Sequence, residues 1–228
     1  MTARQGGRAR RGAGGPRLGL FLVLEGLDGA GTTTQAARLC AALRREGRKV
    51  HLTAEPSGGP VGALIRQVLR GRIGGGAAGR EGFDPRALAL LFAADRLDHV
   101  NVEIAPKLAA GIDVVCDRFT LSSLAYQGAA LGGMPWVAEL NRAAARPDAT
   151  LFLRVRPEVA LRRRQAASVD REIFEIDAFQ RKVARSYREA IRRVRRAGER
   201  VIELDGEVAV DAVAAAVLEA VRALPARS

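Results

Sequence analysis

One segment of this 228-residue chain combines glycines and hydroxyl side chains at a spacing suited to holding phosphate. Residues 26–34 read Gly-Leu-Asp-Gly-Ala-Gly-Thr-Thr-Thr and nearly match the pattern GxxxxGK[ST]. Glycines let the backbone turn tightly and aim N–H groups at phosphate oxygens, and a helix beginning near Thr32 adds the positive end of its dipole. The candidates for phosphate contact are Gly26, Gly29, Ala30, Gly31, Thr32, Thr33 and Thr34.

A magnesium ion beside this loop would need oxygen ligands. Thr33 stands at the hydroxyl position of the pattern, and Asp117 directly follows the apolar run 112–116, which reads as a strand. We therefore expect Thr33 and Asp117 to lie together as a metal site. Thr32 stands where the pattern has lysine, so one point charge is missing while the backbone cradle remains.

The surrounding sequence predicts the elements that position these residues. Residues 18–24 are apolar without alternation, as expected of a strand buried on both faces of a parallel sheet, and 33–46 have helical spacing. Strands and helices then alternate, which predicts the α/β class, with helices on both faces of a five-stranded parallel sheet. The other expected strands are 49–53, 112–116, 150–155 and 201–204, and the other expected helices are 62–69, 86–100, 102–110, 120–130, 136–144, 157–164, 174–196 and 208–224.

Composition and charge limit the partners. A net charge of +12 favours anionic ligands. Residues 1–17 hold five arginines and no acid, so we expect a disordered basic tail, able at most to touch nucleic acid weakly, before an ordered domain over 18–228. Cys40 and Cys116 form no CxxC pair, and no apolar stretch approaches the roughly 20 residues of a membrane span. We expect a cytoplasmic protein with no membrane partner.

Several ordered motifs resemble those of the thymidylate kinases, a P-loop family of nucleoside monophosphate kinases. The resemblance spans nearly the whole chain from Leu18 and implies a three-layer α/β/α P-loop NTPase fold with a small mobile lid. It also implies the substrates dTMP and ATP, the cofactor Mg²⁺, the products dTDP and ADP, and a homodimer packed through helices. The motifs are 24–31 (LEGLDGAG), 55–56 (EP) followed by 58–59 (GG), 91–96 (LFAADR), 117–119 (DRF) and 122–128 (SSLAYQG).

The resemblance assigns roles around the nucleoside. Asp28 would accept a hydrogen bond from the 3′-hydroxyl or join the magnesium shell; the alternative is a turn-forming side chain. Phe92 would stack on thymine and Gln127 would meet the base edge. Tyr126 would fill the space beside C2′ and disfavour ribonucleotides. Phe92 and Tyr126 could equally be packing residues.

Other roles concern phosphate. Arg66, Arg96 and Arg118 would bind the monophosphate and the transferring phosphoryl group, since a guanidinium fork matches phosphate oxygens. Arg66 could instead be a solvated helix residue. Glu55 would shape the acceptor pocket together with Ser123, although the Glu-Pro segment could also be a plain turn.

A lid is expected at about 162–175, where arginines flank the polar loop 165–172. In the bacterial-type thymidylate kinases that this segment resembles, such arginines close over ATP and stabilise transition-state charge. Arg164 and Arg171 are the catalytic candidates of the set, and the alternative is a solvated basic helix end. The arginines of the set are Arg162, Arg163, Arg164 and Arg171.

Three positions depart from the family pattern: Thr32 replaces the loop lysine, Ala54 an arginine before Glu-Pro, and Arg154 an acid in the strand 151–155. A lid arginine could replace the missing charge, or the chain could bind nucleotide and turn it over slowly. A kinase for another nucleotide and a nucleotide-binding protein without catalysis therefore stay open. A nucleic-acid binder ranks last because the basic surface lacks interleaved aromatic residues.

Overall fold

The computed structural model describes residues 18–73, 82–165 and 173–225. The basic tail 1–17, the central part of the expected lid and Arg171 lie outside the described residues. Within the described part of the chain, no helix is both long enough and apolar enough to cross a membrane.

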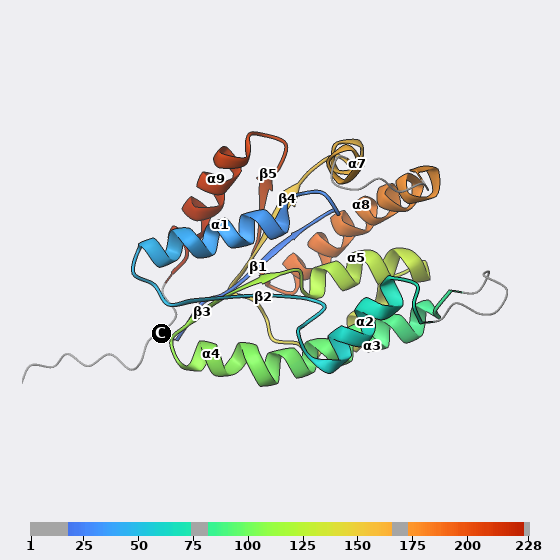
Figure 1. The fold of residues 1–228 in the computed structure, drawn as a ribbon, viewed down its shortest axis with the longest axis horizontal. Helices are drawn as coiled ribbons and strands as arrows, with labels where there is room; N and C mark the ends of the chain where they lie inside the picture. The colour runs from blue at the N-terminus through green and yellow to red at the C-terminus, as the bar shows by residue number, and fades with distance from the viewer. Residues whose placement is uncertain (1–17, 74–81, 166–172, 226–228) are drawn as a thin grey trace, which may run out of the picture.

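The centre of the fold is a parallel sheet in the order β2-β3-β1-β4-β5 (Figure 1). Along the central strand β1, Leu22 and Leu24 pack into one core cluster and Phe21 and Val23 into the other, because successive side chains of a strand point to opposite faces. Both faces are therefore buried, which explains the apolar run without alternation. The strands are β1 Phe21–Gly26, β2 Val50–Ala54, β3 Asp113–Asp117, β4 Ala149–Arg154 and β5 Val201–Asp205.

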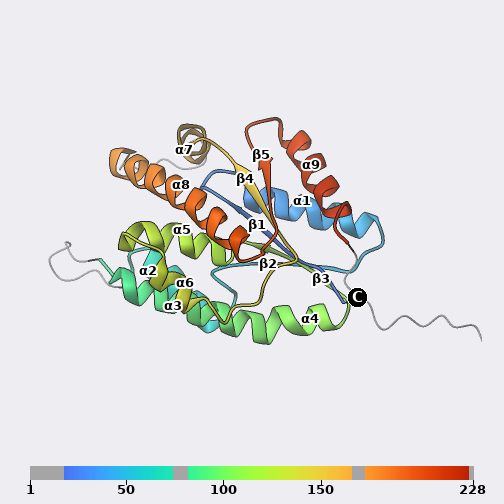
Figure 2. The ribbon, with the colours of Figure 1, turned by 180° about the vertical axis from the view of Figure 1, so that it is seen from behind.

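Helices cover the two faces of the sheet, as Figures 1 and 2 show from opposite sides. On one face lie α1 (Thr32–Arg45) and α9 (Val210–Arg222). The long helix α8 packs along α5 on the other face, and α2 packs on α3. This arrangement confirms the predicted three-layer fold. The remaining helices are α2 Pro60–Leu69, α3 Pro85–His99, η1 Val100–Ile104, α4 Ala105–Ala109, α5 Thr120–Leu131, α6 Pro135–Leu140, α7 Pro157–Gln165 and α8 Ile173–Arg196.

Two helical segments differ from the expectation. The chain continues as helix from α3 into α4, as the sequence predicts, but it passes through η1, a π-helical turn that the sequence analysis did not predict. Pro106 gives the reason, because it lacks an N–H and its ring would clash with the carbonyl of residue 102 in a regular helix. Helix α6 ends at Leu140, four residues early, where the side-chain amide of Asn141 donates to the Val137 carbonyl oxygen (2.8 Å).

Candidate active site

The glycine-rich loop between β1 and α1 has the geometry of a phosphate cradle. Gly29 and Gly31 take positive φ values of 91° and 92°, which glycine adopts without strain. No side chain caps the N-terminus of α1, and its first turn contains no acid. The N–H groups of Thr32, Thr33 and Thr34 therefore stand at the positive end of a helix, where an anion is favoured.

Helix α7 packs directly against this loop. A Cβ atom added at Gly29 would lie 2.2 Å from the carbonyl oxygen of Ala160. Any larger residue at position 29 would therefore displace backbone. On the other side of the loop, Thr32 is only 5% exposed and its methyl group packs near Gly26. Thr32 thus fills a packing position and supplies no charge in place of the lysine.

The two expected metal ligands, Thr33 and Asp117, are in contact beside the phosphate loop. Parallel pairing places Leu24 of β1 beside Asp117 of β3, and the Thr33 hydroxyl donates to Asp117 Oδ2 at 2.5 Å. The second carboxylate oxygen, Asp117 Oδ1, is buried and lacks a hydrogen-bond partner among the described residues. An orphaned carboxylate oxygen beside a hydroxyl is a donor set that suits Mg²⁺, so these residues fit the expected ion.

A cavity of about 240 Å³, here called the loop cavity, opens beside the phosphate loop. Its walls include Gly29, Gly31, Thr34 and Arg163, and also the segment from Gly206 onward. Nη1 of Arg163 donates to the Gly206 carbonyl oxygen at 2.8 Å. Of the arginines of the expected lid that the structure describes, Arg163 therefore lines the loop cavity, whereas Arg162 and Arg164 do not.

A second cavity, of about 280 Å³ and here called the Tyr126 cavity, reaches the phosphate loop at Asp28. It gathers residues from the phosphate loop, the Glu-Pro segment, α2, α3, the segment that follows β3, and α5. Gln127 Oε1 is buried and has no hydrogen-bond partner among the described residues. The expected residues that line the cavity are Asp28, Glu55, Phe92, Arg96, Arg118, Ser123, Tyr126 and Gln127.

Arg66 is the expected phosphate ligand that the structure does not bring to this cavity. Its Nη1 donates to the carbonyl oxygens of Pro56 (2.9 Å) and Ser57 (2.7 Å). Arg66 therefore helps to hold the segment that carries Glu55 in place through these two hydrogen bonds.

Arg96 and Glu55 form a buried ion pair in the cavity wall. Arg96 is 1% exposed, and its Nη2 lies 2.6 Å from Glu55 Oε2 and 3.0 Å from the Ser123 hydroxyl. Its Nη1 contacts Asn141 Oδ1, and its guanidinium lies over the Phe119 ring. The two buried charges thus neutralise each other, so removal of either one would leave the other buried without a counter-charge.

Arg118 connects the cavity to the phosphate loop. Its Nη2 donates to Asp28 Oδ1 at 2.7 Å, and its guanidinium lies over the ring of Tyr126, 5.3 Å from the centroid. The Asp28 N–H in turn donates to the Tyr126 hydroxyl at 3.1 Å. Asp28 of the loop, Arg118 and Tyr126 therefore contact one another and form one wall of the Tyr126 cavity.

Behind Arg118 lie three side chains that the sequence analysis missed: Glu25, Ser122 and Tyr187. Glu25 is fully buried at the carboxyl end of β1 and is hydrogen-bonded to both Ser122 and Tyr187. Burial raises the pKa of the Glu25 carboxyl, while Arg118 and the hydrogen bonds of Ser122 and Phe119 oppose that rise. A carboxylate within an apolar strand was the one signal that could have pointed to this group.

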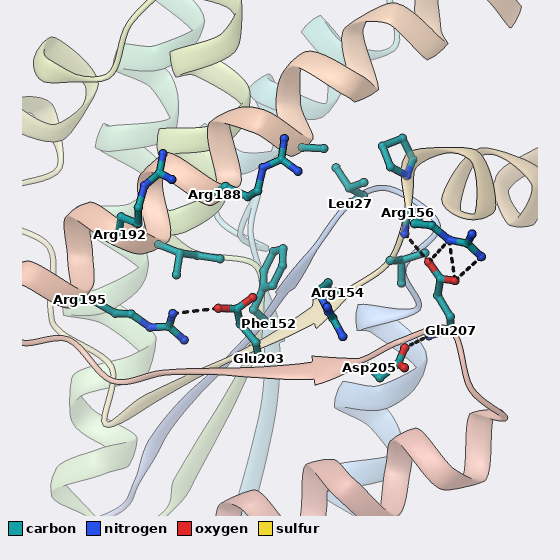
Figure 3. A pocket seen from close by; sticks show the side chains of 14 residues that line it. Leu27, Phe152, Arg154, Arg156, Arg188, Arg192, Arg195, Glu203, Asp205 and Glu207 are labelled. Atoms are coloured by element: carbon teal, nitrogen blue, oxygen red, sulfur yellow. Dashed lines mark hydrogen bonds and ion pairs between the residues drawn. The ribbon is translucent and has the colours of Figure 1, made fainter.

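A further hollow, of about 570 Å³, lies between α8 and the strands β4 and β5 (Figure 3). Arg154, the departure from the family pattern, lines this hollow and not the loop cavity. Figure 3 shows that the guanidinium groups of Arg188 and Arg192 point away from that of Arg154. These arginines therefore do not converge on one anion, and the chemistry is expected at the two cavities beside the loop.

Comparison with known proteins agrees with this geometry. The family model described as thymidylate kinase matches residues 24–217. A probable thymidylate kinase of Pyrobaculum calidifontis is 42% identical over 199 residues, which cover 86% of this chain and 94% of that protein. A thymidylate kinase of Thermomicrobium roseum is 42% identical over 210 residues, covering 89% and 96%. The chain therefore belongs to the thymidylate kinase family.

Proposed function

We propose that this protein transfers the γ-phosphoryl group of ATP to the 5′-phosphate of dTMP, giving dTDP and ADP. One observation carries the proposal: the Tyr126 cavity reaches Asp28 and the loop cavity begins at Gly29, so the two cavities adjoin at consecutive residues of the phosphate loop. Phosphoryl transfer depends on holding donor and acceptor in line, and adjoining cavities provide that arrangement.

The Tyr126 cavity suits a thymidine nucleotide. Phe92 offers a flat face for a base, and the unpartnered Gln127 Oε1 can accept a hydrogen bond from the N3–H of thymine. Tyr126 is held at Asp28 by its hydroxyl, so its ring forms a fixed wall beside the sugar. These contacts favour a deoxynucleotide with an N–H at that edge of the base.

In phosphoryl transfer the protein itself takes little part in making or breaking covalent bonds. The acceptor phosphate is already anionic near neutral pH, so no strong general base is required. Arg118 lies between the loop and the Tyr126 cavity, where its charge would stabilise the transferring group. Thr33 and Asp117 would hold Mg²⁺, which supplies positive charge to the phosphate oxygens.

A coupled assay with purified protein and Mg-ATP tests this function. We expect dTMP to be turned over in preference to dUMP, UMP, dCMP and CMP, with formation of ADP and dTDP. Equal turnover of dTMP, UMP and CMP would remove the thymine assignment. Binding of ATP with no dTDP above background would favour a nucleotide-binding protein without catalysis.

We further propose that Arg163 supplies the charge that the loop lacks at Thr32. Arg163→Ala should lower kcat/KM for ATP by about 10- to 100-fold, the size of one charge-assisted hydrogen bond. Thr32→Lys should restore part of that loss in the Arg163→Ala background. The exposed neighbour Arg162 provides the matched control, Arg162→Ala, which should leave kcat/KM within twofold of the wild type. Equal losses in both arginine variants would contradict the assignment.

A homodimer packed through helices is part of the same proposal. Leu90 and Leu97 lie on one side of α3 because they are seven residues apart, and both are exposed, as is Leu64 on the neighbouring helix α2. We expect Leu90→Glu/Leu97→Glu to shift the protein from dimer to monomer in light scattering. Leu52→Glu/Val208→Glu is the control, because both residues are exposed but lie away from α2 and α3, on β2 and in the segment before α9. A monomeric wild type would reject the dimer. A cytoplasmic location stays a prediction.

A further inference from the structure

We infer that Glu25 is a positioning residue that fixes Arg118 through the hydroxyl groups of Ser122 and Tyr187. This inference rests on the proposed function and adds to it three side chains from β1, α5 and α8. None of the three belongs to the phosphate loop or the metal site.

The Glu25 carboxylate is surrounded by donors. Oε1 accepts the backbone N–H groups of Phe119 and Ser122, both at 2.9 Å. Oε2 accepts the hydroxyl protons of Ser122 (2.6 Å) and Tyr187 (2.9 Å). Four donors on two oxygens are the pattern of an ionised carboxylate, which only accepts. Glu25 also caps α5, because the N-cap residue Phe119 has no side chain that could do so.

The hydroxyl groups of Ser122 and Tyr187 connect the Glu25 carboxylate to Arg118. A hydroxyl has one proton, so once that proton points at Glu25 only lone pairs remain for other partners. Arg118 Nη1 lies 3.2 Å from the Ser122 oxygen and 3.3 Å from the Tyr187 oxygen. Its third acceptor is the Gly26 carbonyl oxygen at 3.0 Å. The Tyr187 hydroxyl also lies 3.0 Å from the Gly26 carbonyl oxygen, but an ionised carboxylate is the stronger acceptor. Glu25 therefore directs both hydroxyl protons toward itself, and the hydroxyl oxygens hold one end of the guanidinium.

The other end of the guanidinium is left facing the reaction site. Nη2 points to Asp28 beside the Tyr126 cavity. The backbone of Arg118 has φ 70°, a left-handed conformation that is uncommon for a residue other than glycine. The Arg118 N–H bonded to Leu24 (2.9 Å) and the Phe119 N–H bonded to Glu25 hold this conformation from both sides. Side chain and backbone of Arg118 are therefore fixed by the same buried group.

Glu25→Gln is the sharpest test because it keeps the size of the side chain and one accepting oxygen. The new amide would present donors where two hydroxyl protons now point, so both hydroxyls must find other acceptors. The Tyr187 hydroxyl would turn to the Gly26 carbonyl oxygen (3.0 Å), which Arg118 Nη1 also uses, and the Ser122 hydroxyl to the Tyr187 oxygen (3.0 Å), so the acceptors that hold Arg118 are shared or reoriented. We expect kcat for dTMP to fall about 10- to 100-fold, as for a misplaced catalytic group, with KM within about threefold. Tyr187→Phe, which removes one of the two hydroxyls, should lower kcat for dTMP about tenfold.

A double-mutant cycle separates positioning from plain structural support. In an Arg118→Ala background, Glu25→Gln should lower kcat by no further factor beyond about twofold, because the group it acts on is gone. A role only as helix cap would cost the same factor in both backgrounds. Ile191→Val, one turn after Tyr187 on α8, controls for core damage: it should lower Tm by about 2–4 °C without changing kcat.

Two kinetic outcomes would overturn the inference: a Glu25→Gln enzyme with wild-type kcat, or equal losses in the presence and absence of Arg118. If the wild type makes no dTDP, the proposed function fails, and the network is then tested by crystal structures of the wild type and Glu25→Gln. These should show the Arg118 guanidinium displaced by about 1 Å or more, the scale on which a catalytic group is misplaced. An unmoved guanidinium would reject the inference whatever the reaction.

Discussion

Replacing Arg118 with alanine is expected to reduce kcat for dTMP by about 10³-fold, the scale of an arginine that stabilises a transferring phosphoryl group. Arg118 donates to Asp28 in the phosphate loop and lines the Tyr126 cavity, so in the proposed reaction its charge would stand between donor and acceptor. Steady-state kinetics with saturating Mg-ATP measures the loss, and circular dichroism checks that the variant is folded.

Two further variants make that result interpretable. Arg118→Lys keeps the charge but loses the planar fork, so it should recover only part of the activity. Arg142→Ala removes an exposed arginine that pairs with Glu139, and it should leave kcat within twofold. An Arg118→Ala enzyme that retained more than a tenth of wild-type kcat would show that Arg118 does not act on the transition state.

Replacing Glu55 with alanine is expected to lower the free energy of unfolding by about 3–5 kcal/mol, because the guanidinium of Arg96 would stay buried without its counter-charge. For a chain of this size the loss corresponds to a fall in Tm of about 6–20 °C. Urea unfolding followed by circular dichroism measures the free energy directly.

Two further variants compare the buried Glu55–Arg96 pair with a partly exposed ion pair, and distinguish its contribution to stability from its role in substrate binding. Glu103→Ala removes a partly exposed partner of His51 and should cost less than about 1 kcal/mol. Glu55→Leu/Arg96→Met replaces both charges with apolar groups and should recover much of the stability but not the activity toward dTMP. Wild-type stability of Glu55→Ala would mean that solvent or another side chain compensates Arg96.

The phosphate loop was the part of the site most open to prediction. Its glycines, Thr33 and Asp117 follow strands, and the carboxyl ends of parallel strands meet at one edge of a sheet. The linear order of those residues therefore implied their proximity. Strand positions were predicted within three residues, because strands buried on both faces leave an uninterrupted apolar run.

Other residues depended on tertiary packing that spacing does not encode. Arg163 faces the loop because it lies three residues after Ala160, which contacts Gly29, and only the packed structure shows which side of α7 meets the loop. Arg66 turned toward nearby carbonyl oxygens, which its helical position did not indicate. Tyr187 reaches Glu25 across 162 positions of the chain, so no local pattern could connect the two.

The close approach of Gly29 to Ala160 also has a mechanical consequence. Backbone meets backbone there, with no flexible side chain between them to absorb a displacement. A shift of α7 must therefore push the glycine-rich turn, and a shift of that turn must push α7. In the proposed reaction, filling of the loop cavity by nucleotide would reach α7 by steric contact alone.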